Sequence, residues 1–344
     1  MTKRLPLIFS LIVSVLALVP AYSQPAHAGE YMEALGEDYL AITKDAWGYV
    51  RAASRGRSAR RIENRRQNLL NTIGEAKSRI SRLPGWQGDP SFRDAVVNYL
   101  DINYNVLNDD YDKIIDLEEV AEQSYDLMEA YLLAQELAEK KMDEAFQALD
   151  QKQHAFADQY GITLVGSESR QAEKLRQATA ANRYYNDLFL IFFKAYKQEL
   201  YFMAALEEGD VSKLEQNRSA LGAYAQEGLD LLDTIPRFNN DLTLKVACTE
   251  AMNFYKLEGG DASQSAVDFL LAKSEFEEIQ ELIENTSKNK RTQDMIDEYN
   301  SSVSAYNQVL QEYNSSMESL NRRRSVMLEK WESVRESFFE RHMP

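Results

Sequence analysis

A dense cluster of arginines is the feature of this sequence best suited to binding a ligand. The segment RAASRGRSARRIENRR at 51–66 holds seven arginines and one acidic residue, Glu63, in a chain whose formal net charge is −16. A guanidinium group forms planar, two-point hydrogen bonds with carboxylate, sulfate and phosphate groups. We therefore expect the segment to contact an acidic protein or a polyanion such as a glycosaminoglycan or lipopolysaccharide. The seven residues are Arg51, Arg55, Arg57, Arg60, Arg61, Arg65 and Arg66.

Compensation inside the protein is the alternative interpretation of these arginines. Six acidic residues occur in the segment 109–119, which we expect on a neighbouring helix, and ion pairs with them would neutralise the cluster. A second basic run, Arg322, Arg323 and Arg324, would extend the cluster if the last helix packs beside the second. The acidic residues are Asp109, Asp110, Asp112, Asp116, Glu118 and Glu119.

Residue patterns typical of enzyme active sites are scarce in this chain. His154 and His342 are the only histidines after the N-terminal segment, and neither has the spacing of a zinc or di-iron site. No glycine-rich phosphate loop occurs. Cys248, the one cysteine, lies in an apolar helical pattern and is expected to be a buried thiol. The sequence therefore predicts a protein that is not an enzyme and that has no cofactor and no metal ligands.

The N-terminus has the layout of a secretory signal peptide. A basic start and an apolar run lead to the small-residue cleavage site Ala26-His27-Ala28. We expect 1–28 to be removed and the protein to be exported to the periplasm, the cell surface or the medium. Loss of the two cations of this segment changes the net charge from −16 to −18, which disfavours nucleic acid as a partner. Later apolar runs are too short for a transmembrane segment.

Helical patterns dominate the rest of the chain. Apolar residues recur at spacings of three and four between clusters of glycine and proline. The pattern predicts an all-α fold, an elongated multi-helix bundle forming one domain over 29–344 with a possible sub-boundary near 159–167. Only GITLVG at 161–166 could be extended, and Asn108 favours a break in the third helix. The eight predicted helices span roughly 30–54, 58–83, 91–158, 167–208, 211–235, 240–257, 262–288 and 291–341.

Two of these helices carry a polar residue within an otherwise apolar stripe. Glu199 interrupts the stripe of the helix predicted at 167–208, which we expect to be the most buried one. Arg324 interrupts the heptad seam of the last helix.

The last predicted helix is long enough for a coiled coil. Tyr299, Tyr306 and Tyr313 recur at every seventh residue, and each is followed by an asparagine. Heptad spacing favours packing of the tyrosines in a seam over ligand binding. The asparagines are expected to hydrogen-bond to tyrosine hydroxyls or to the backbone of a neighbouring helix. The seam also makes this helix a candidate for homo-oligomerisation.

Several segments resemble those of the ErpY-like surface lipoprotein family, a bacterial family best known from leptospires. The resemblance would cover the whole mature chain, and it implies an exported, envelope-associated helical protein. It also implies binding of host plasma proteins such as complement regulators, with which leptospiral members are associated. The chain departs from the lipoprotein pattern because no cysteine lies at the predicted cleavage site. The similar segments are YMEALGEDY, EQSYDLMEAYLLA, YYNDLFLIFFKAYKQELY and the Tyr-Asn heptads.

Two functional hypotheses follow from the sequence. The first is an exported, surface-associated, non-enzymatic binding protein that engages host or extracellular macromolecules through 51–66, with Arg322 and Arg323 as an extension. The second is a periplasmic structural or chaperone-like coiled-coil protein, in which the last helix matters more than any charged surface.

Overall fold

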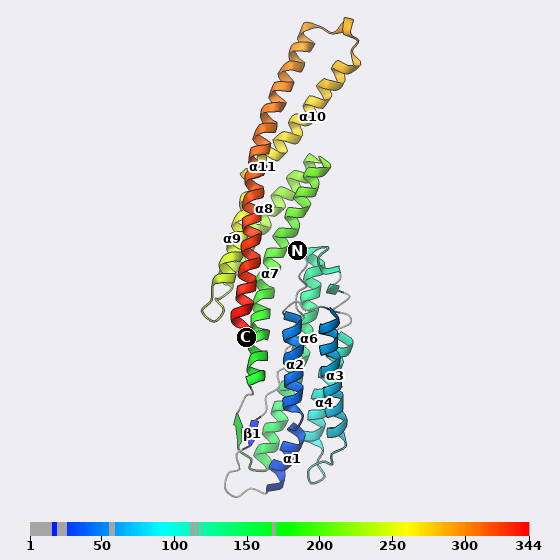
Figure 1. The fold of residues 1–344 in the computed structure, drawn as a ribbon, viewed down its shortest axis with the longest axis vertical. Coiled ribbons are helices and arrows are strands. Elements are labelled where there is room, and N and C mark those ends of the chain that lie inside the picture. The colour runs from blue at the N-terminus through cyan, green and yellow to red at the C-terminus, as the bar shows by residue number, and fades with distance from the viewer. Residues whose placement is uncertain are drawn as a thin grey trace. The chain divides into compact units, whose positions relative to one another are not determined.

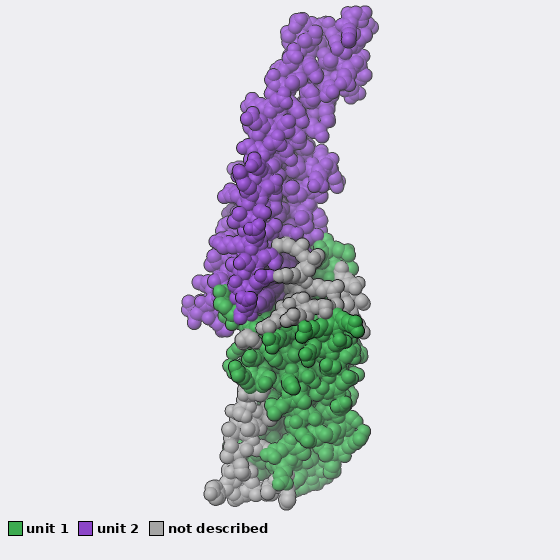
Figure 2. Space-filling view, in the orientation of Figure 1, with its two compact units in different colours: residues 1–183, 341–344 green, residues 184–340 purple. Residues whose placement is uncertain are grey.

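The protein folds as a bundle of α-helices, and the predicted all-α class is confirmed (Figure 1). A computed structural model describes residues 16–18, 26–54, 59–110, 114, 117–118, 120–166 and 170–343. The chain divides into two compact units, residues 1–183 with 341–344 (unit 1) and residues 184–340 (unit 2) (Figure 2). We expected one domain with a sub-boundary near 159–167. The division instead falls inside a continuous helix, at Arg183.

Unit 1 packs its helices in sequence order, with α2 against α3, α3 against α4 and α4 against α6. A short antiparallel ladder joins β1, which lies in the predicted signal peptide, to β2, which lies in the segment GITLVG. The elements are β1 (Leu16–Leu18), α1 (Ala26–Gly36), α2 (Tyr39–Ser54), α3 (Ala59–Ser81), α4 (Ser91–Asn105), the π-helical turn η1 (Val106–Asp110), α6 (Tyr125–Gln159) and β2 (Leu164–Gly166).

Unit 2 begins within α7 and contains the longest helix of the described chain, α11. Helices α8 and α9 pack closely against each other, and α10 also contacts α8. The elements are α7 (Arg170–Glu208), α8 (Val211–Thr234), α9 (Thr243–Glu258), η2 (Asp261–Ser263), α10 (Gln264–Asn285), η3 (Lys288–Lys290) and α11 (Gln293–His342).

Most predicted helices agree with the structure to within a few residues, and two differ. The predicted helix 30–54 is interrupted at Glu37-Asp38, which separates α1 from α2. The predicted helix 91–158 is interrupted, since the π-helical turn η1 occupies the region of Asn108 where a break was expected and residues 122–124 are not helical. Helix α6 then starts anew at Ser124, whose side chain accepts a hydrogen bond from the backbone N–H of Leu127.

The α3–α4 connection of unit 1 and the α8–α9 connection of unit 2 have the same construction. The backbones of Trp86 and Asp89 form an isolated antiparallel β-bridge in the first connection, and those of Phe238 and Asp241 form one in the second. Both central residues of each turn have positive φ, the backbone of a type I′ turn. The aspartate then accepts a hydrogen bond from a backbone N–H two residues on, at 2.9 Å in unit 1 and 2.8 Å in unit 2. The positive-φ residues are Gln87, Gly88, Asn239 and Asn240.

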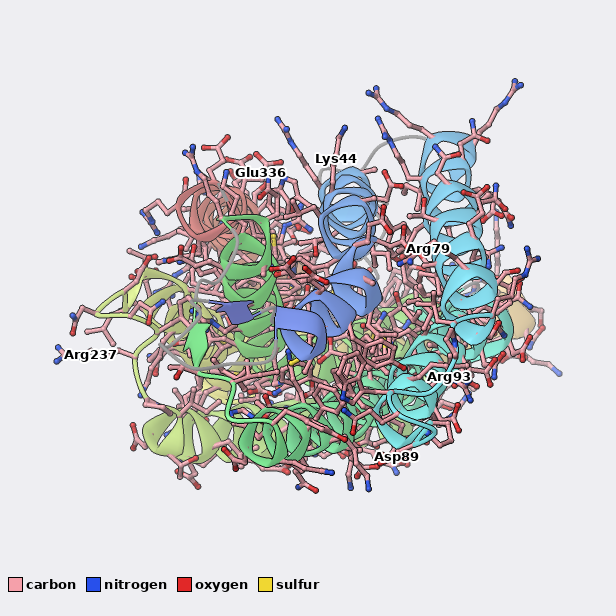
Figure 3. All side chains as sticks on the ribbon, turned by 90° about the horizontal axis from the view of Figure 1, so that it is seen from below. Lys44, Arg79, Asp89, Arg93, Arg237 and Glu336 are labelled. Carbon is pink, nitrogen blue, oxygen red and sulfur yellow. The ribbon has the colours of Figure 1, made fainter. Side chains whose placement is uncertain are left out.

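A cation closes each of these two connections in the same way. Arg93 Nη1 donates to the carbonyl of Leu83 at 2.8 Å, and Lys245 Nζ donates to the carbonyl of Ile235 at 2.7 Å. Both bonds satisfy a carbonyl that the end of the preceding helix leaves unpaired. Asp89 and Arg93 lie near each other at the first connection, and Arg237 projects outward from the second (Figure 3).

Aromatic contacts extend this correspondence to the other helices. Tyr31 of α1 lies 5.5 Å from Trp86 and 5.9 Å from Phe156 of α6, between ring centroids. In unit 2, Tyr184 of α7 lies 5.2 Å from Phe238 and 5.8 Å from Phe338 of α11. The two connections and the rings packed against them therefore repeat between the units, with Tyr31, Trp86 and Phe156 corresponding to Tyr184, Phe238 and Phe338.

Helix α10 from Leu271 onward and the first half of α11 form an antiparallel pair, residues 271–316, that we call the arm, and Phe269 of α10 lies two residues before it (Figure 1). The rings of Phe269 and Tyr313 stack at 4.4 Å, and those of Phe276 and Tyr306 stack at 5.1 Å. The described tyrosines of the Tyr-Asn repeat therefore pack in a seam, as their spacing predicted. No described residue from 271 to 316 is fully buried.

Candidate functional site

Helix α3 presents three arginines of the predicted cluster to solvent. Arg60, Arg61 and Arg65 lie in its first two turns and are exposed, and Arg51 is exposed in the last turn of α2. Arg65 runs along α2, since a Cβ placed on Gly48 would lie 3.6 Å from its Nη1. The predicted site residues Arg55 and Arg57 lie outside the described residues.

Arg66 differs from its neighbours and must be removed from the predicted binding site. It is only 6% exposed, its Nε and Nη2 donate to the Glu63 carboxylate at 2.8 Å, and its Nη1 donates to the carbonyl of Leu107 at 2.8 Å. The hydrogen bond from Arg66 also lowers the pKa of Glu63. Because its donors are used inside unit 1, Arg66 joins α3 to η1 and is not available to an external ligand.

Among the described residues, the predicted compensation by the acidic segment 109–119 does not extend to Arg60, Arg61 or Arg65, and Asp112, Asp116 and Glu119 lie outside the described residues. Asp110 accepts a hydrogen bond from Lys141 at 2.6 Å, and Asp109 accepts one from Asn108 at 2.8 Å. Within the part of the chain that the structure describes, no ion pair involves Arg60, Arg61 or Arg65. We call these three residues the arginine face.

The predicted extension at Arg322 and Arg323 lies in unit 2, on α11. Both side chains are exposed, and Arg322 pairs with Glu318 one turn earlier at 3.2 Å. The arginine face belongs to unit 1.

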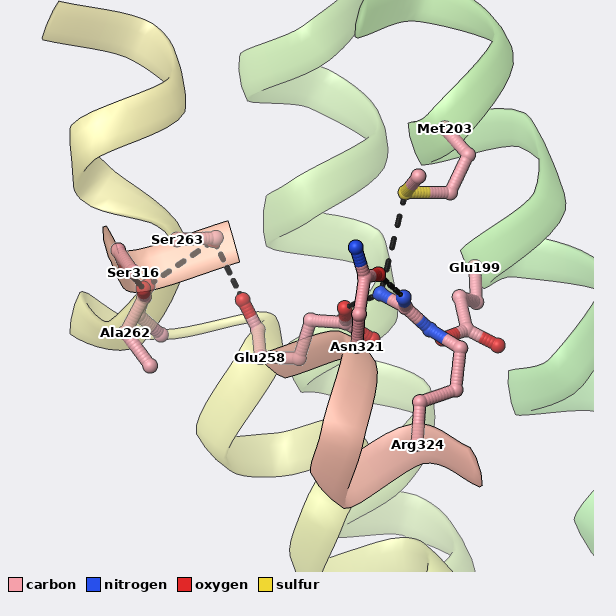
Figure 4. Close-up of polar contacts among 9 residues, drawn as sticks. Glu199, Met203, Glu258, Ala262, Ser263, Ser316, Asn321 and Arg324 are labelled. Carbon is pink, nitrogen blue, oxygen red and sulfur yellow. Dashed lines mark hydrogen bonds and ion pairs between the residues drawn. The ribbon is translucent and has the colours of Figure 1, made fainter. Parts of the chain in front are cut away.

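Arg324 is the third arginine of that run, and it lies inside unit 2. Its guanidinium group contacts both Glu199 of α7 and Glu258 at the end of α9, which are 2% and 0% exposed (Figure 4). Asn321 accepts a further hydrogen bond from Arg324, and the Met203 sulfur lies 3.8 Å away. The two polar interruptions seen in the sequence, Glu199 and Arg324, are thus partners of each other.

Charge balance in this buried cluster requires a bound proton. Two carboxyl groups face one guanidinium group, so the cluster would carry a negative charge if both carboxyls were ionised. Burial and the nearby Glu199 carboxylate together raise the pKa of Glu258 to about 8, against the opposing effect of Arg324. At neutral pH the cluster therefore holds one proton. Its contacts connect α7, α9 and α11, which is a structural role.

Unit 1 has a smaller buried ion pair. Arg183 Nη2 donates to Glu139 Oε2 at 2.8 Å, and Glu139 is 5% exposed. Burial raises the pKa of Glu139 to about 7 even though the bond to Arg183 lowers it. Sequence reasoning missed Glu139 and Glu258 because each looks like one of many charged residues on a helix.

Cys248 is buried in unit 2, as its apolar pattern predicted. Its Sγ donates to the carbonyl of Leu188 at 3.4 Å, and burial raises its pKa well above the ordinary value for a thiol. A thiol in this environment is unreactive as a nucleophile.

Within the described residues, His, Cys, Asp and Glu side chains form no group that could hold a metal ion. The helices of the same part of the chain include none with both the length and the apolar character of a membrane span. The arginine face is the candidate binding site because its three arginines are exposed and have no ion pair among the described residues. Comparison of the chain with protein-family models, with curated proteins and with solved structures finds no match.

Proposed function

We propose that the chain is an exported, non-enzymatic binding protein whose arginine face engages an acidic protein surface or a polyanion. The observation that carries the proposal is three exposed arginines without an ion pair to any described residue, in a chain of net charge −16. Arg51, exposed in the last turn of α2, is a further candidate contact.

The position of these arginines supports a ligand rather than a role in folding. Arg60 and Arg61 lie in the first turn of α3, where the positive end of the helix dipole disfavours cations. Each such residue costs about 0.3–1 kcal/mol unless an anion compensates it. A bound carboxylate, sulfate or phosphate group would remove that cost and accept several guanidinium hydrogen bonds.

Two sequence features supply the rest of the proposal. The predicted signal peptide would place the protein where extracellular and envelope polyanions occur. The resemblance to the ErpY-like family agrees with a surface-associated binding role, for which a host protein with an acidic surface is one candidate partner.

Retention on heparin and on immobilised lipopolysaccharide at increasing salt tests the proposal. We expect R60E/R61E/R65E to elute at clearly lower salt than the wild type, because charge contacts with a polyanion are weakened by salt. The matched control is R322E/R323E, which reverses two exposed arginines of unit 2. Circular dichroism would verify that all variants stay folded. If the α3 variant and the wild type elute together, the arginine face is not the site.

A second candidate function, a helical spacer or chaperone-like protein, is favoured by the arm. The arm is held together by its own aromatic seam, without a fully buried described residue, so both helices keep most of their surface for contacts. Light scattering of an aggregating client protein, with and without the arm deleted, would test this function. Equal scattering in the two samples would count against it.

A further inference from the structure

Between Tyr299 and Ser316, one face of α11 is uncharged and lies against no described helix. Five exposed residues follow a spacing of four and three along it, which places them on one side of the helix. We call them the amide stripe. They are Asn300, Ser304, Asn307, Gln311 and Asn314.

The asparagines of this stripe do not make the hydrogen bonds that their spacing predicted. Among the described residues, the side chains of Asn300, Asn307 and Asn314 have no hydrogen-bond partner, and all three are exposed. The expectation that they bond to tyrosine hydroxyls or to a neighbouring helix is therefore wrong. The reason is that Tyr299, Tyr306 and Tyr313 turn toward Phe269 and Phe276 of α10, while the following residue points away.

Charge is almost absent from this part of α11. Glu312 is the only charged residue from 299 to 316, whereas 27% of the whole chain is charged. Helix α10 is the opposite, since its arm segment carries Lys273 and a series of acidic residues. Those residues are Glu275, Glu277, Glu278, Glu281 and Glu284.

We propose that the amide stripe is the contact surface for a second copy of this chain. Two copies of net charge −16 repel each other at most orientations, and the repulsion is smallest where both present an uncharged face. Depletion of charged residues is also typical of the centre of a protein interface. An amide side chain both donates and accepts hydrogen bonds, so it is complementary to another amide.

The spacing of the stripe specifies an antiparallel arrangement. Asn300 and Asn314 lie seven residues before and after Asn307, so a twofold axis at Asn307 pairs Asn307 with itself and Asn300 with Asn314 of the second copy. Ser304 is short, which lets the two helices approach closely. The contact is independent of the arginine face, because it uses different residues of a different unit.

Sedimentation equilibrium of the full chain over a range of concentrations tests this inference. We expect a monomer–dimer equilibrium that N307E weakens by at least ~10-fold, because it places two negative charges opposite each other. The matched control S274E adds the same charge to the exposed face of α10 and should leave the equilibrium unchanged. The double variant N300K/N314E should dimerise at least as well as the wild type, since an antiparallel pair places each lysine opposite a glutamate.

Disulfide formation in N307C gives a second readout that does not depend on affinity. Cys248 is buried and should not interfere, so oxidation should yield a covalent dimer from N307C and very little from S274C. A chain that stays monomeric at all concentrations, with no N307C crosslink, overturns the proposal. Equal weakening of the dimer by N307E and S274E overturns it too. A third contrary outcome is a wild type that is strictly monomeric and binds a polysaccharide, if N307E abolishes that binding.

Discussion

The buried Glu258 should make unit 2 less stable as the pH rises, and Glu258→Gln should remove that dependence. In the folded protein the pKa of Glu258 is about 8, against an ordinary value of 4.5. Between these values the folded state keeps a proton that the unfolded state releases, so the free energy of unfolding falls with increasing pH. The contribution of this group is therefore fully present below pH 4.5 and is lost as the pH approaches about 8.

The size of the effect follows from the linkage relation. Each pH unit within that window costs about 1.4 kcal/mol, so raising the pH from about 5 to about 7 should lower the free energy of unfolding by roughly 3 kcal/mol through Glu258. Glutamine has the shape of the protonated acid and does not ionise. Between pH about 5 and about 7, the free energy of unfolding of E258Q should therefore rise by roughly 3 kcal/mol relative to that of the wild type.

Urea unfolding at several pH values, followed by tryptophan fluorescence, measures this difference. Trp331 lies in the core of unit 2, so replacing Trp47 and Trp86 by phenylalanine restricts the signal to that unit. The matched control is E250Q on the same helix, because Glu250 is partly exposed and pairs with Lys330. If the wild type and E258Q lose stability in parallel as the pH rises, Glu258 is ionised in the folded state and the reasoning fails.

Two further predictions concern residues whose roles the structure changes or clarifies. Arg66→Ala should lower the free energy of unfolding of unit 1 by about 2–4 kcal/mol, since it leaves the Leu107 carbonyl and the Glu63 carboxylate without their partner. Arg65→Ala should change it by less than ~0.5 kcal/mol, and equal losses in urea titrations would contradict the distinction between the two. Tyr306→Ala removes the ring between Phe269 and Phe276, and it should destabilise the arm by about 1–3 kcal/mol. Faster amide hydrogen exchange confined to the arm would support this, whereas Gln308→Ala should leave exchange unchanged.

Local sequence patterns were sufficient to predict most of the helices. Apolar spacing and glycine positions located most helix ends, and Gly209 with Asp210 illustrates why. Gly209 has a φ of 73°, and the Asp210 side chain accepts a hydrogen bond from the backbone N–H of Lys213. Such signals act between near neighbours in sequence. These helix-end signals can therefore be recognised in the sequence without knowledge of the tertiary structure.

Partners distant in sequence could not be predicted in the same way. Arg324 and Glu199 were each recognisable as polar residues in apolar stripes, but no pattern linked them to each other or to Glu258. Glu258 precedes two glycines at a helix end, which is typical of an exposed position. Only packing of α9 against its neighbours buries it.

The spacing of the arginines relative to the apolar residues of α3 distinguishes the buried arginine of the cluster from the exposed ones. Arg65 and Arg66 are adjacent and chemically identical, yet one is exposed and the other buried. Arg66 lies one helical turn before Leu69 and Leu70, which form the apolar face of α3, and this spacing places it on the buried side. The repeated turns were also detectable, since proline, aromatic residue and aspartate recur at equal spacing in 84–89 and 236–241.

The arm has a property that follows from the heptad spacing of its seam. Contacts of Phe269 and Phe276 with the tyrosines of α11 recur at every seventh residue on both helices. Removing or adding seven residues in α10 and seven in α11 together would keep the remaining rings in register. The arm can therefore change length in steps of seven residues per helix while the core around Trp331 stays unaltered. In chains related to this one, we expect the lengths of α10 and α11 within the arm to differ by multiples of seven residues.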